Sequence, residues 1–291
     1  QAGNVRMATA QAGESGKKVI EARGVSFGHG DGDLVHEFST TILRGDRIGL
    51  VGPNGSGKTT LLKLLLGELQ PRSGEMKRGT QLQVAYFDQY RATLREDWNA
   101  IENVAEGRES VTVGGRPKHV IGYLQDFLFT PERARAPITR LSGGERNRLL
   151  LARLFAQPSN LLVMDEPTND LDVETLELLE ELLADYPGTL LLVSHDRDFL
   201  DNVVTSTIVM EGDGRIGEFV GGYSDWLRQA AAAAERQALA QARPATASVS
   251  ASGVPAAASQ PKAKRSFKEI KELEQLPLRI ETISVASYHG G

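Results

Sequence analysis

Short apolar runs and longer amphipathic segments alternate along most of this chain, with polar turns between them. Residues 19–27 and 34–43 alternate apolar and polar side chains around a glycine-rich turn, which predicts a pair of antiparallel strands. Further apolar runs predict strands at residues 47–51, 81–87, 160–166, 189–193, 207–210 and 215–220. Leucine or alanine at helical spacing predicts helices at residues 60–66, 142–155, 173–186 and 225–239. This order predicts an α/β fold, a mixed sheet with a mainly parallel core beside an antiparallel β edge.

Composition changes near both ends of the chain. Residues 1–17 are small and polar, as in a linker, and with no initiator Met they are expected to continue a longer protein. A compact domain is expected over residues 18–228, with a lobe of short helices at 99–129. Breaks between these helices are expected at Gly107, Gly114, Gly115 and Pro117. An Ala/Ser/Pro-rich linker then covers 229–262, and helix-like patterning resumes within 263–291.

Charge and composition limit which partners, metal sites and cellular location the sequence predicts. The 291 residues carry a net charge of −5, so only local basic patches are candidates for nucleic-acid binding. The basic stretch at residues 262–271 is one such patch, and it fits a solvated linker and helix start equally well. With no cysteine and five dispersed histidines, the chain predicts no disulfide framework and no zinc site, and we expect a cytoplasmic location. No apolar run approaches the roughly 20 residues that span a bilayer.

A glycine-rich stretch between the strand and the helix predicted at 47–51 and 60–66 matches the pattern G-x-x-x-x-G-K-[ST]. It consists of Gly52, Pro53, Asn54, Gly55, Ser56, Gly57, Lys58 and Thr59. In such a loop, backbone N–H groups and the helix N-terminus surround a polyphosphate. Lys58 is expected to reach the terminal phosphates, and Thr59 to help hold Mg²⁺. The alternative is a purely structural turn, which the flanking strand and helix patterns disfavour.

Polar side chains follow other predicted strands. Asp165 and Glu166 end a buried-type run, so they are expected at the sheet edge that also carries the glycine-rich loop. In the chemical interpretation, Asp165 orders the water around Mg²⁺ and Glu166 polarises the water that attacks the γ-phosphate; the alternative is a solvated strand end. Gln89 and His195 also follow strands, and His195 is expected to contact the γ-phosphate. Glu166 is what distinguishes an ATPase from a passive nucleotide binder.

A second helix start suited to anions follows the helical lobe. It is formed by Leu141, Ser142, Gly143, Gly144 and Glu145. Ser142 is placed to cap the helix, and the glycines leave backbone N–H groups open to an anion.

These motifs resemble, in order, those of ATP-binding-cassette domains. The Walker A, Q-loop, signature, Walker B, D-loop and switch-histidine motifs correspond to residues 52–59, Gln89, 141–145, 160–166, 169–172 and His195. Residues 165–172, 194–200 and 222–226 further resemble the soluble ABC-F group, most of all the second cassette of its Uup type. By that resemblance, residues 18–228 are the ATPase domain and 263–291 begin a coiled-coil domain.

The resemblance implies ATP and Mg²⁺ as cofactors. It assigns catalytic roles to Glu166 as general base, to His195 as γ-phosphate sensor and to Lys58. It assigns the metal to Thr59, Gln89 and Asp165. Nucleotide contacts are implied for every Walker A and signature residue, and for His29, Thr60, Gln89 and Asp165. His29 stands where cassettes usually carry the aromatic that stacks on adenine, and the signature is expected to serve a partner cassette's site.

The function implied is an ATPase whose ATP-driven closure grips a nucleic-acid target, either the ribosome or branched DNA. A second cassette is the implied partner, so one cassette alone is expected to hydrolyse ATP slowly, at a rate that rises with protein concentration. One alternative is the motor subunit of an ABC membrane transporter, which residues 169–172 and 194–197 and the basic tail disfavour. Another is a non-hydrolysing ATP-gated module, which Glu166 disfavours.

Overall fold

A six-stranded mixed sheet forms the centre of the protein in the computed structural model, which describes residues 17–28, 32–88, 94–113 and 116–242. Its strand order is β11-β10-β3-β9-β8-β5. The strands are β3 (Arg47–Val51), β5 (Val84–Asp88), β8 (Leu161–Asp165), β9 (Thr189–Val193), β10 (Ser206–Gly212) and β11 (Arg215–Val220). All neighbours pair in parallel except β10 and β11, which form an antiparallel hairpin. The predicted fold class, a mixed sheet with a mainly parallel core, is confirmed.

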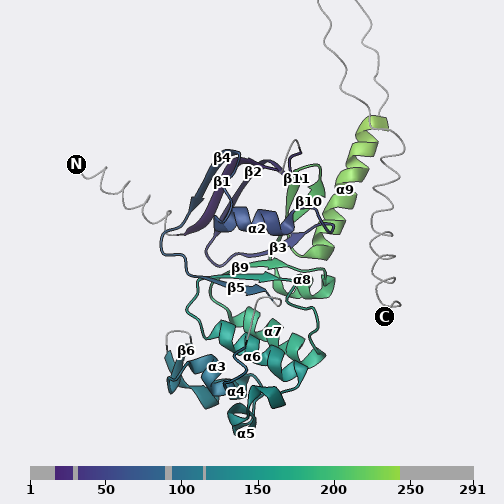
Figure 1. The fold of residues 1–291 in the computed structure, drawn as a ribbon. Coiled ribbons are helices and arrows are strands. Elements are labelled where there is room, and N and C mark those ends of the chain that lie inside the picture. Colours follow the sequence, from purple (N-terminus) through teal and green to yellow (C-terminus); the bar gives the residue numbers. More distant parts are fainter. Residues whose placement is uncertain (1–16, 29–31, 89–93, 114–115, 243–291) are drawn as a thin grey trace, which may run out of the picture. The chain divides into compact units, whose positions relative to one another are not determined.

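A three-stranded antiparallel sheet covers one face of the protein in the order β2-β1-β4. It contains β1 (Lys18–Phe27), β2 (Val35–Leu43) and β4 (Ser73–Arg78), and α2 (Lys58–Leu66) lies between it and the central sheet (Figure 1). Four leucines of α2 are fully buried between the layers: Leu61, Leu62, Leu64 and Leu65. The predicted strand pair β1 and β2 is confirmed, whereas no strand was predicted where β4 forms.

The opposite face of the central sheet packs against α6 (Gly143–Phe155), α7 (Val173–Asp185) and α8 (Arg197–Val203). Alternate residues of β9 enter the two cores, with Leu190 and Leu192 toward these helices and Leu191 and Val193 toward α2. Both faces are therefore covered, which explains why the parallel strands are unbroken apolar runs.

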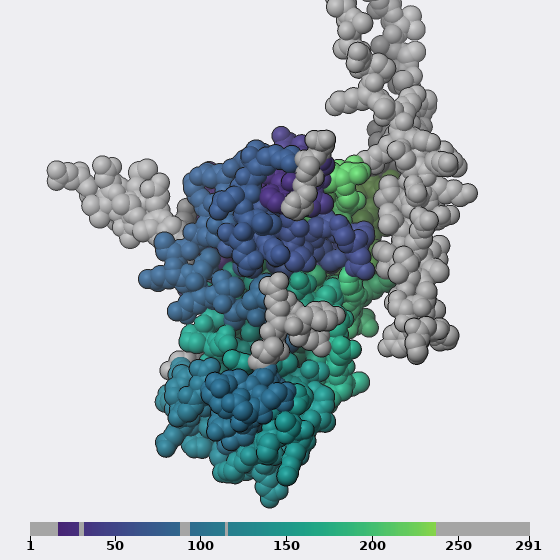
Figure 2. Space-filling view, viewed as in Figure 1, coloured from purple at the N-terminus to yellow at the C-terminus, as the bar shows by residue number. Residues whose placement is uncertain are grey.

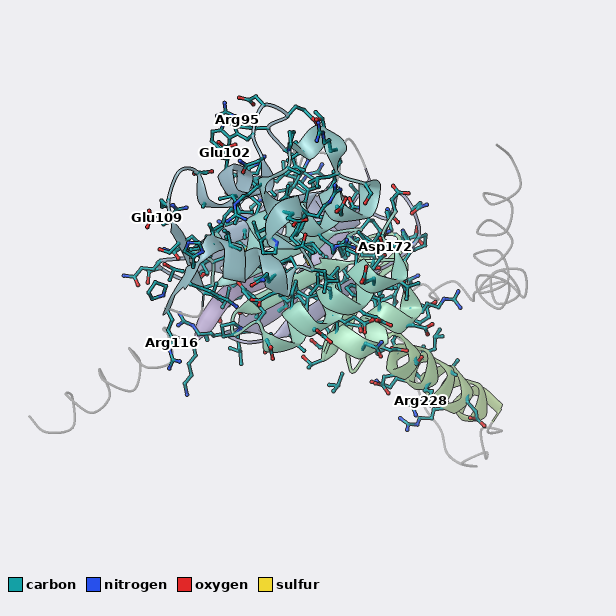
Figure 3. The ribbon with its side chains drawn as sticks, turned by 90° about the horizontal axis from the view of Figure 1, so that it is seen from below. Arg95, Glu102, Glu109, Arg116, Asp172 and Arg228 are labelled. Carbon is teal, nitrogen blue, oxygen red and sulfur yellow. The ribbon has the colours of Figure 1, made fainter. Side chains whose placement is uncertain are left out.

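The lobe before α6 contains three short helices: α3 (Ala100–Ala105), α4 (Val120–Asp126) and α5 (Pro131–Arg135). It also contains a hairpin of β6 (Ser110–Val113) and β7 (Arg116–His119), followed by the 3₁₀ turn Ile138–Arg140. The expectation of helices alone is therefore wrong, because the predicted break at Gly114 and Gly115 joins two strands. In Figure 2 the lobe forms the lower end of the drawn surface, and Figure 3 shows Glu102, Glu109 and Arg116 on the side away from Asp172.

The hairpin of β10 and β11 leads into α9 (Tyr223–Ala242), which continues past residue 228. Contacts within the chain divide it into residues 1–242 and 243–291, and only the first unit contains described residues. The boundaries proposed for the linkers and the C-terminal segment stay predictions. Across the described ranges, no helix is both long and apolar enough to cross a membrane.

Candidate active site

The glycine-rich loop joins β3 to α2 as predicted, and α2 begins at Lys58 with Gly57 as its N-cap. Gly57 has φ 101° and no side chain that could cap the helix. The first-turn N–H groups therefore lack a side-chain acceptor, and the positive end of the helix dipole opens onto the loop. Gly52 lies so close to the neighbouring strand that an added Cβ would sit 3.1 Å from the Met210 carbonyl oxygen. This loop is shaped to bind an anion.

Lys58 is 8% exposed, and its ammonium group bonds to the loop itself. Its Nζ donates hydrogen bonds to the carbonyl oxygens of Gly52 at 2.8 Å and Pro53 at 3.1 Å. Burial lowers the pKa of Lys58, and the charges of Glu166 and Asp165 oppose that shift. Because a phosphate would offer a stronger, charged acceptor, Lys58 is poised to exchange these carbonyl bonds for phosphate oxygens.

Asp165 ends β8 beside β5, where two hydroxyl groups meet one of its carboxylate oxygens. The Thr59 hydroxyl and the Tyr86 hydroxyl each donate a long hydrogen bond of 3.5 Å to Oδ2 of Asp165. Hydroxyl and carboxylate oxygens suit Mg²⁺, which usually completes its shell with water and substrate phosphate. Among the described residues no group of three or more His, Cys, Asp or Glu side chains could hold a metal ion. The sequence did not predict the role of Tyr86.

Glu166 follows Asp165 with a left-handed backbone, φ 50°, and its N–H donates to the Val193 carbonyl oxygen at 2.8 Å. Its Oε2 accepts a hydrogen bond from the His195 backbone N–H at 3.2 Å. Its Oε1 is buried and accepts no hydrogen bond from the described residues, although it lies 3.2 Å from Nε2 of His195. Burial raises the pKa of Glu166, while the His195 N–H and Lys58 lower it. A buried carboxylate with an unused acceptor and a strained backbone is typical of a catalytic base.

His195 lies in the loop between β9 and α8, and its imidazole lies against Glu166. Partial burial, and then the positive charge of Lys58, lowers the pKa of His195 below its usual value of 6.5. The lowered pKa favours the neutral imidazole, and the contact with Glu166 is an ion pair only when His195 is protonated. A neutral imidazole can donate a hydrogen bond to an anion bound beside Lys58.

The signature motif begins α6 through a capping box. Ser142 Oγ accepts from the Glu145 N–H at 3.2 Å, and Glu145 Oε2 accepts from the Ser142 N–H at 2.8 Å, as the predicted cap requires. Asn147 then donates to the Asp170 carbonyl oxygen at 3.0 Å, and an added Cβ on Gly144 would meet the Asp172 carboxylate. Among the described residues, the bonds of this motif lead to α5 and to the 3₁₀ turn, and those of the next turn of α6 lead to segment 170–174 rather than to the loop 52–59.

The structure therefore brings part of the predicted site together. Lys58, Thr59, Asp165, Glu166 and His195 gather at the carboxyl edge of the central sheet, and the signature residues do not join them. His29 and Gln89 lie outside the described residues. A cleft of about 290 Å³ adjoins the loop, lined by Asp33, Leu34, residues 53–56 and the turn 212–214. The sequence did not predict that this turn borders the loop.

The sequence matches the ABC transporter family over residues 35–169, so this edge of the sheet belongs to an ATP-binding cassette. The chain is a member of the ATP-binding-cassette ATPases. Within that class it belongs with the Uup proteins of the ABC-F type. It is 53% identical to ATP-binding protein Uup of Escherichia coli over 97% of this chain and 44% of that protein.

A second relative is the energy-dependent translational throttle protein EttA of Haemophilus influenzae, 37% identical over 72% of this chain and 38% of that protein. A solved bacterial Atm1-family ABC exporter with ATP bound matches 78% of this chain and 43% of its own, with a TM-score of 0.57 and 22% identity, which shows the fold alone. The chain thus spans less than half the length of these relatives.

Proposed function

We propose that this chain binds ATP with Mg²⁺ and hydrolyses the γ-phosphate as one cassette of a two-cassette clamp on a nucleic-acid target. The observation that carries the proposal is the buried carboxylate of Glu166, with an unused acceptor, beside Lys58 and His195. A passive nucleotide site has no need of such a group, because phosphate binding requires only donors.

Each side chain then has a role. The loop backbone, Lys58 and the N-terminus of α2 bind the phosphates, and His195 donates a hydrogen bond to the γ-phosphate. Glu166 accepts the proton of the attacking water. Thr59 and Asp165 hold Mg²⁺, which supplies positive charge to the phosphate oxygens when bound.

Three further residues complete the proposed site. Tyr86 fixes Asp165 through its hydroxyl group. Gln89 completes the metal site, and His29 stacks on the adenine ring.

The signature motif supplies the second half of the proposal. Gly143 and Gly144 present backbone N–H groups and Ser142 presents a hydroxyl, and among the described residues no bond links these groups to their own chain's glycine-rich loop. We assign them to the ATP held by a partner cassette, so that each ATP lies between two cassettes. Hydrolysis by the separate chain is then slow and rises with its concentration.

The target is proposed from the relatives. One relative's name, translational throttle protein, concerns translation, and the ABC-F resemblance favours a cytoplasmic protein that grips ribosomes or branched DNA. A clamp of this kind closes when ATP binds and opens after hydrolysis. Blocking hydrolysis should therefore trap the protein on its target.

The test uses the full-length protein that contains this chain, carrying Glu166→Gln, sedimented from lysate with ATP. The matched control is Lys58→Ala, which loses phosphate binding and so should not close. We expect ribosomal particles or branched DNA to co-sediment with Glu166→Gln only. Membranes in place of both would favour the transporter motor, and identical sedimentation of the two variants would contradict the clamp.

A further inference from the structure

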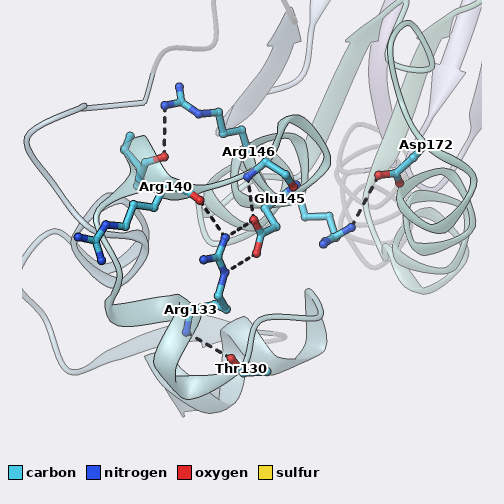
Figure 4. A network of polar contacts seen from close by, with 9 residues as sticks. Thr130, Arg133, Arg140, Glu145, Arg146 and Asp172 are labelled. Carbon is cyan, nitrogen blue, oxygen red and sulfur yellow. Dashed lines mark hydrogen bonds and ion pairs between the residues drawn. The ribbon is translucent and has the colours of Figure 1, made fainter.

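Arg133 binds Glu145, the acidic residue of the signature motif, through hydrogen bonds and an ion pair (Figure 4). No motif of the sequence singles out Arg133. Its Nε donates to Oε1 of Glu145 at 2.7 Å and its Nη2 donates to Oε2 at 2.5 Å, a two-pronged contact between planar groups. The same Nη2 donates to the Arg140 carbonyl oxygen at 3.0 Å, just before the signature. Arg133 therefore ties α5 to both the approach and the first turn of α6.

Glu145 is at the same time the acceptor that shapes the start of α6. Its Oε2 receives both Arg133 Nη2 and the Ser142 backbone N–H, and its own N–H bonds to the Ser142 hydroxyl. The guanidinium lowers the pKa of Glu145 to about 2, so this acceptor stays ionised at every physiological pH. The position of Ser142 is thus fixed through Glu145 by a side chain on another helix.

The first glycine of the signature turn cannot hold the turn in place through a side chain of its own. Gly143 has no side chain, and a Cβ added to it would meet none of the described atoms within 4 Å, so no side-chain packing at this position holds the turn. A phosphate-binding turn contributes most when its donors are already oriented before the ligand arrives.

We propose that Arg133 is a positioning residue for ATP hydrolysis, which acts through Glu145 to orient Ser142, Gly143 and Gly144 toward the ATP of the partner cassette. This inference rests on the proposed function of the signature motif. It predicts that loss of Arg133 lowers the turnover of the closed dimer and leaves ATP binding at the glycine-rich loop of its own chain intact.

Other contacts hold the lobe against α6, so we expect the lobe to stay folded when Arg133 is replaced. Arg146 donates to both carboxylate oxygens of Glu96, at 2.7 and 3.1 Å, and to the Ile138 carbonyl oxygen at 3.2 Å. Phe127 and Ile138 are buried in the same core as α6. These contacts remain when Arg133 is replaced.

The experiment compares Arg133→Met and Arg133→Lys in the full-length protein, with Arg135→Met as the control. Arg135 lies on the same helix, and its bond among the described residues is to the Pro131 carbonyl oxygen, so its loss removes equal charge without touching Glu145. We expect kcat to fall about tenfold or more for both Arg133 variants, because lysine cannot form the two-pronged contact, and to stay unchanged for Arg135→Met. ATP affinity of the separate chain 1–291 should not change.

A double-mutant cycle tests whether Arg133 acts through Glu145. Arg133→Met and Glu145→Gln together should reduce kcat no further than Glu145→Gln alone, since both break one unit. Additive losses would overturn the inference, as would equal loss of ATP affinity and kcat in Arg133→Lys.

The Ser142→Arg variant distinguishes a failure of the role proposed for Arg133 from a failure of the role proposed for the signature motif. If Ser142→Arg leaves hydrolysis intact, the proposed role of the signature fails. If Ser142→Arg abolishes hydrolysis while both Arg133 variants keep the wild-type kcat, only the positioning role of Arg133 fails.

Discussion

Gly52→Ala tests the shape of the phosphate-binding loop more directly than any charge change. A Cβ on Gly52 would lie 2.7 Å from Ser56 Oγ, 3.0 Å from Met210 Cβ and 3.1 Å from the Met210 carbonyl oxygen. Two of these atoms belong to β10 close to its backbone and cannot swing away. The loop must therefore shift from β10, which we expect to cost about 1–3 kcal/mol of unfolding free energy, as overpacking usually does.

The matched control is the same substitution at Gly122, inside α4. There an added Cβ meets only the Lys118 side chain, at 3.8 Å. Alanine favours a helix over glycine by about 1 kcal/mol, so Gly122→Ala should raise the unfolding free energy by up to that amount. One added methyl group is thus expected to act with opposite sign at the two positions.

Urea denaturation measures both free energies, and titration with a fluorescent ATP analogue measures binding. We expect Gly52→Ala to weaken binding at least tenfold, because the loop N–H groups no longer converge on one phosphate, and Gly122→Ala to bind as the wild type does. Unchanged ATP affinity in Gly52→Ala, or destabilisation by both variants alike, would refute the tight approach of the loop to β10.

Two further substitutions probe the chemistry. Glu166→Gln should lower turnover about 10²–10⁴-fold, and it should raise the unfolding free energy at neutral pH, because burial raises the pKa of Glu166. The sign follows from linkage: ionised Glu166 destabilises the fold above its raised pKa, and below the usual value of 4.5 the cost disappears, so unfolding curves of wild type and variant should converge in acid. Tyr86→Phe removes a donor to Asp165 and should raise the Mg²⁺ concentration for half-maximal hydrolysis about tenfold; an unchanged Mg²⁺ requirement would exclude a role for Tyr86.

Strands β3, β8 and β9 of the central sheet were predictable because their burial on two faces leaves no polar interruption. β4 was not predictable in this way, since Ser73–Arg78 is a polar edge strand whose side chains are mostly exposed. Its existence depends on pairing with β1, for example Ile20 with Arg78, which the local sequence does not reveal.

The sequence of β6 and β7 contains a pattern typical of a hairpin, which we interpreted wrongly as a break between helices. Val111, Thr112 and Val113 alternate around a polar position and are followed by two glycines, which favours a two-residue hairpin turn as much as a break between helices. Over so few residues, the sequence pattern of a short strand pair differs little from that of a broken helix.

The candidate site was predictable where chemistry follows a strand end. Asp165, Glu166 and His195 end parallel neighbours, so topology alone brings them to Lys58. Tyr86 and Arg133 could not be identified from the sequence, because the role proposed for each depends on a distant partner. The Tyr86 hydroxyl reaches Asp165 across two paired strands, and Arg133 reaches Glu145 from a separate helix.

The central claim is that each ATP needs the glycine-rich loop of one cassette and the signature of another. The most direct measurement mixes two inactive forms of the chain 1–291, one carrying Glu166→Gln and the other Ser142→Arg, and records ATP hydrolysis. A mixed pair contains one complete site, with Glu166 from one chain and Ser142 from the other, so activity should appear on mixing and rise with concentration. A mixture no more active than the sum of its parts, at concentrations where the wild-type chain hydrolyses ATP, would contradict the shared site.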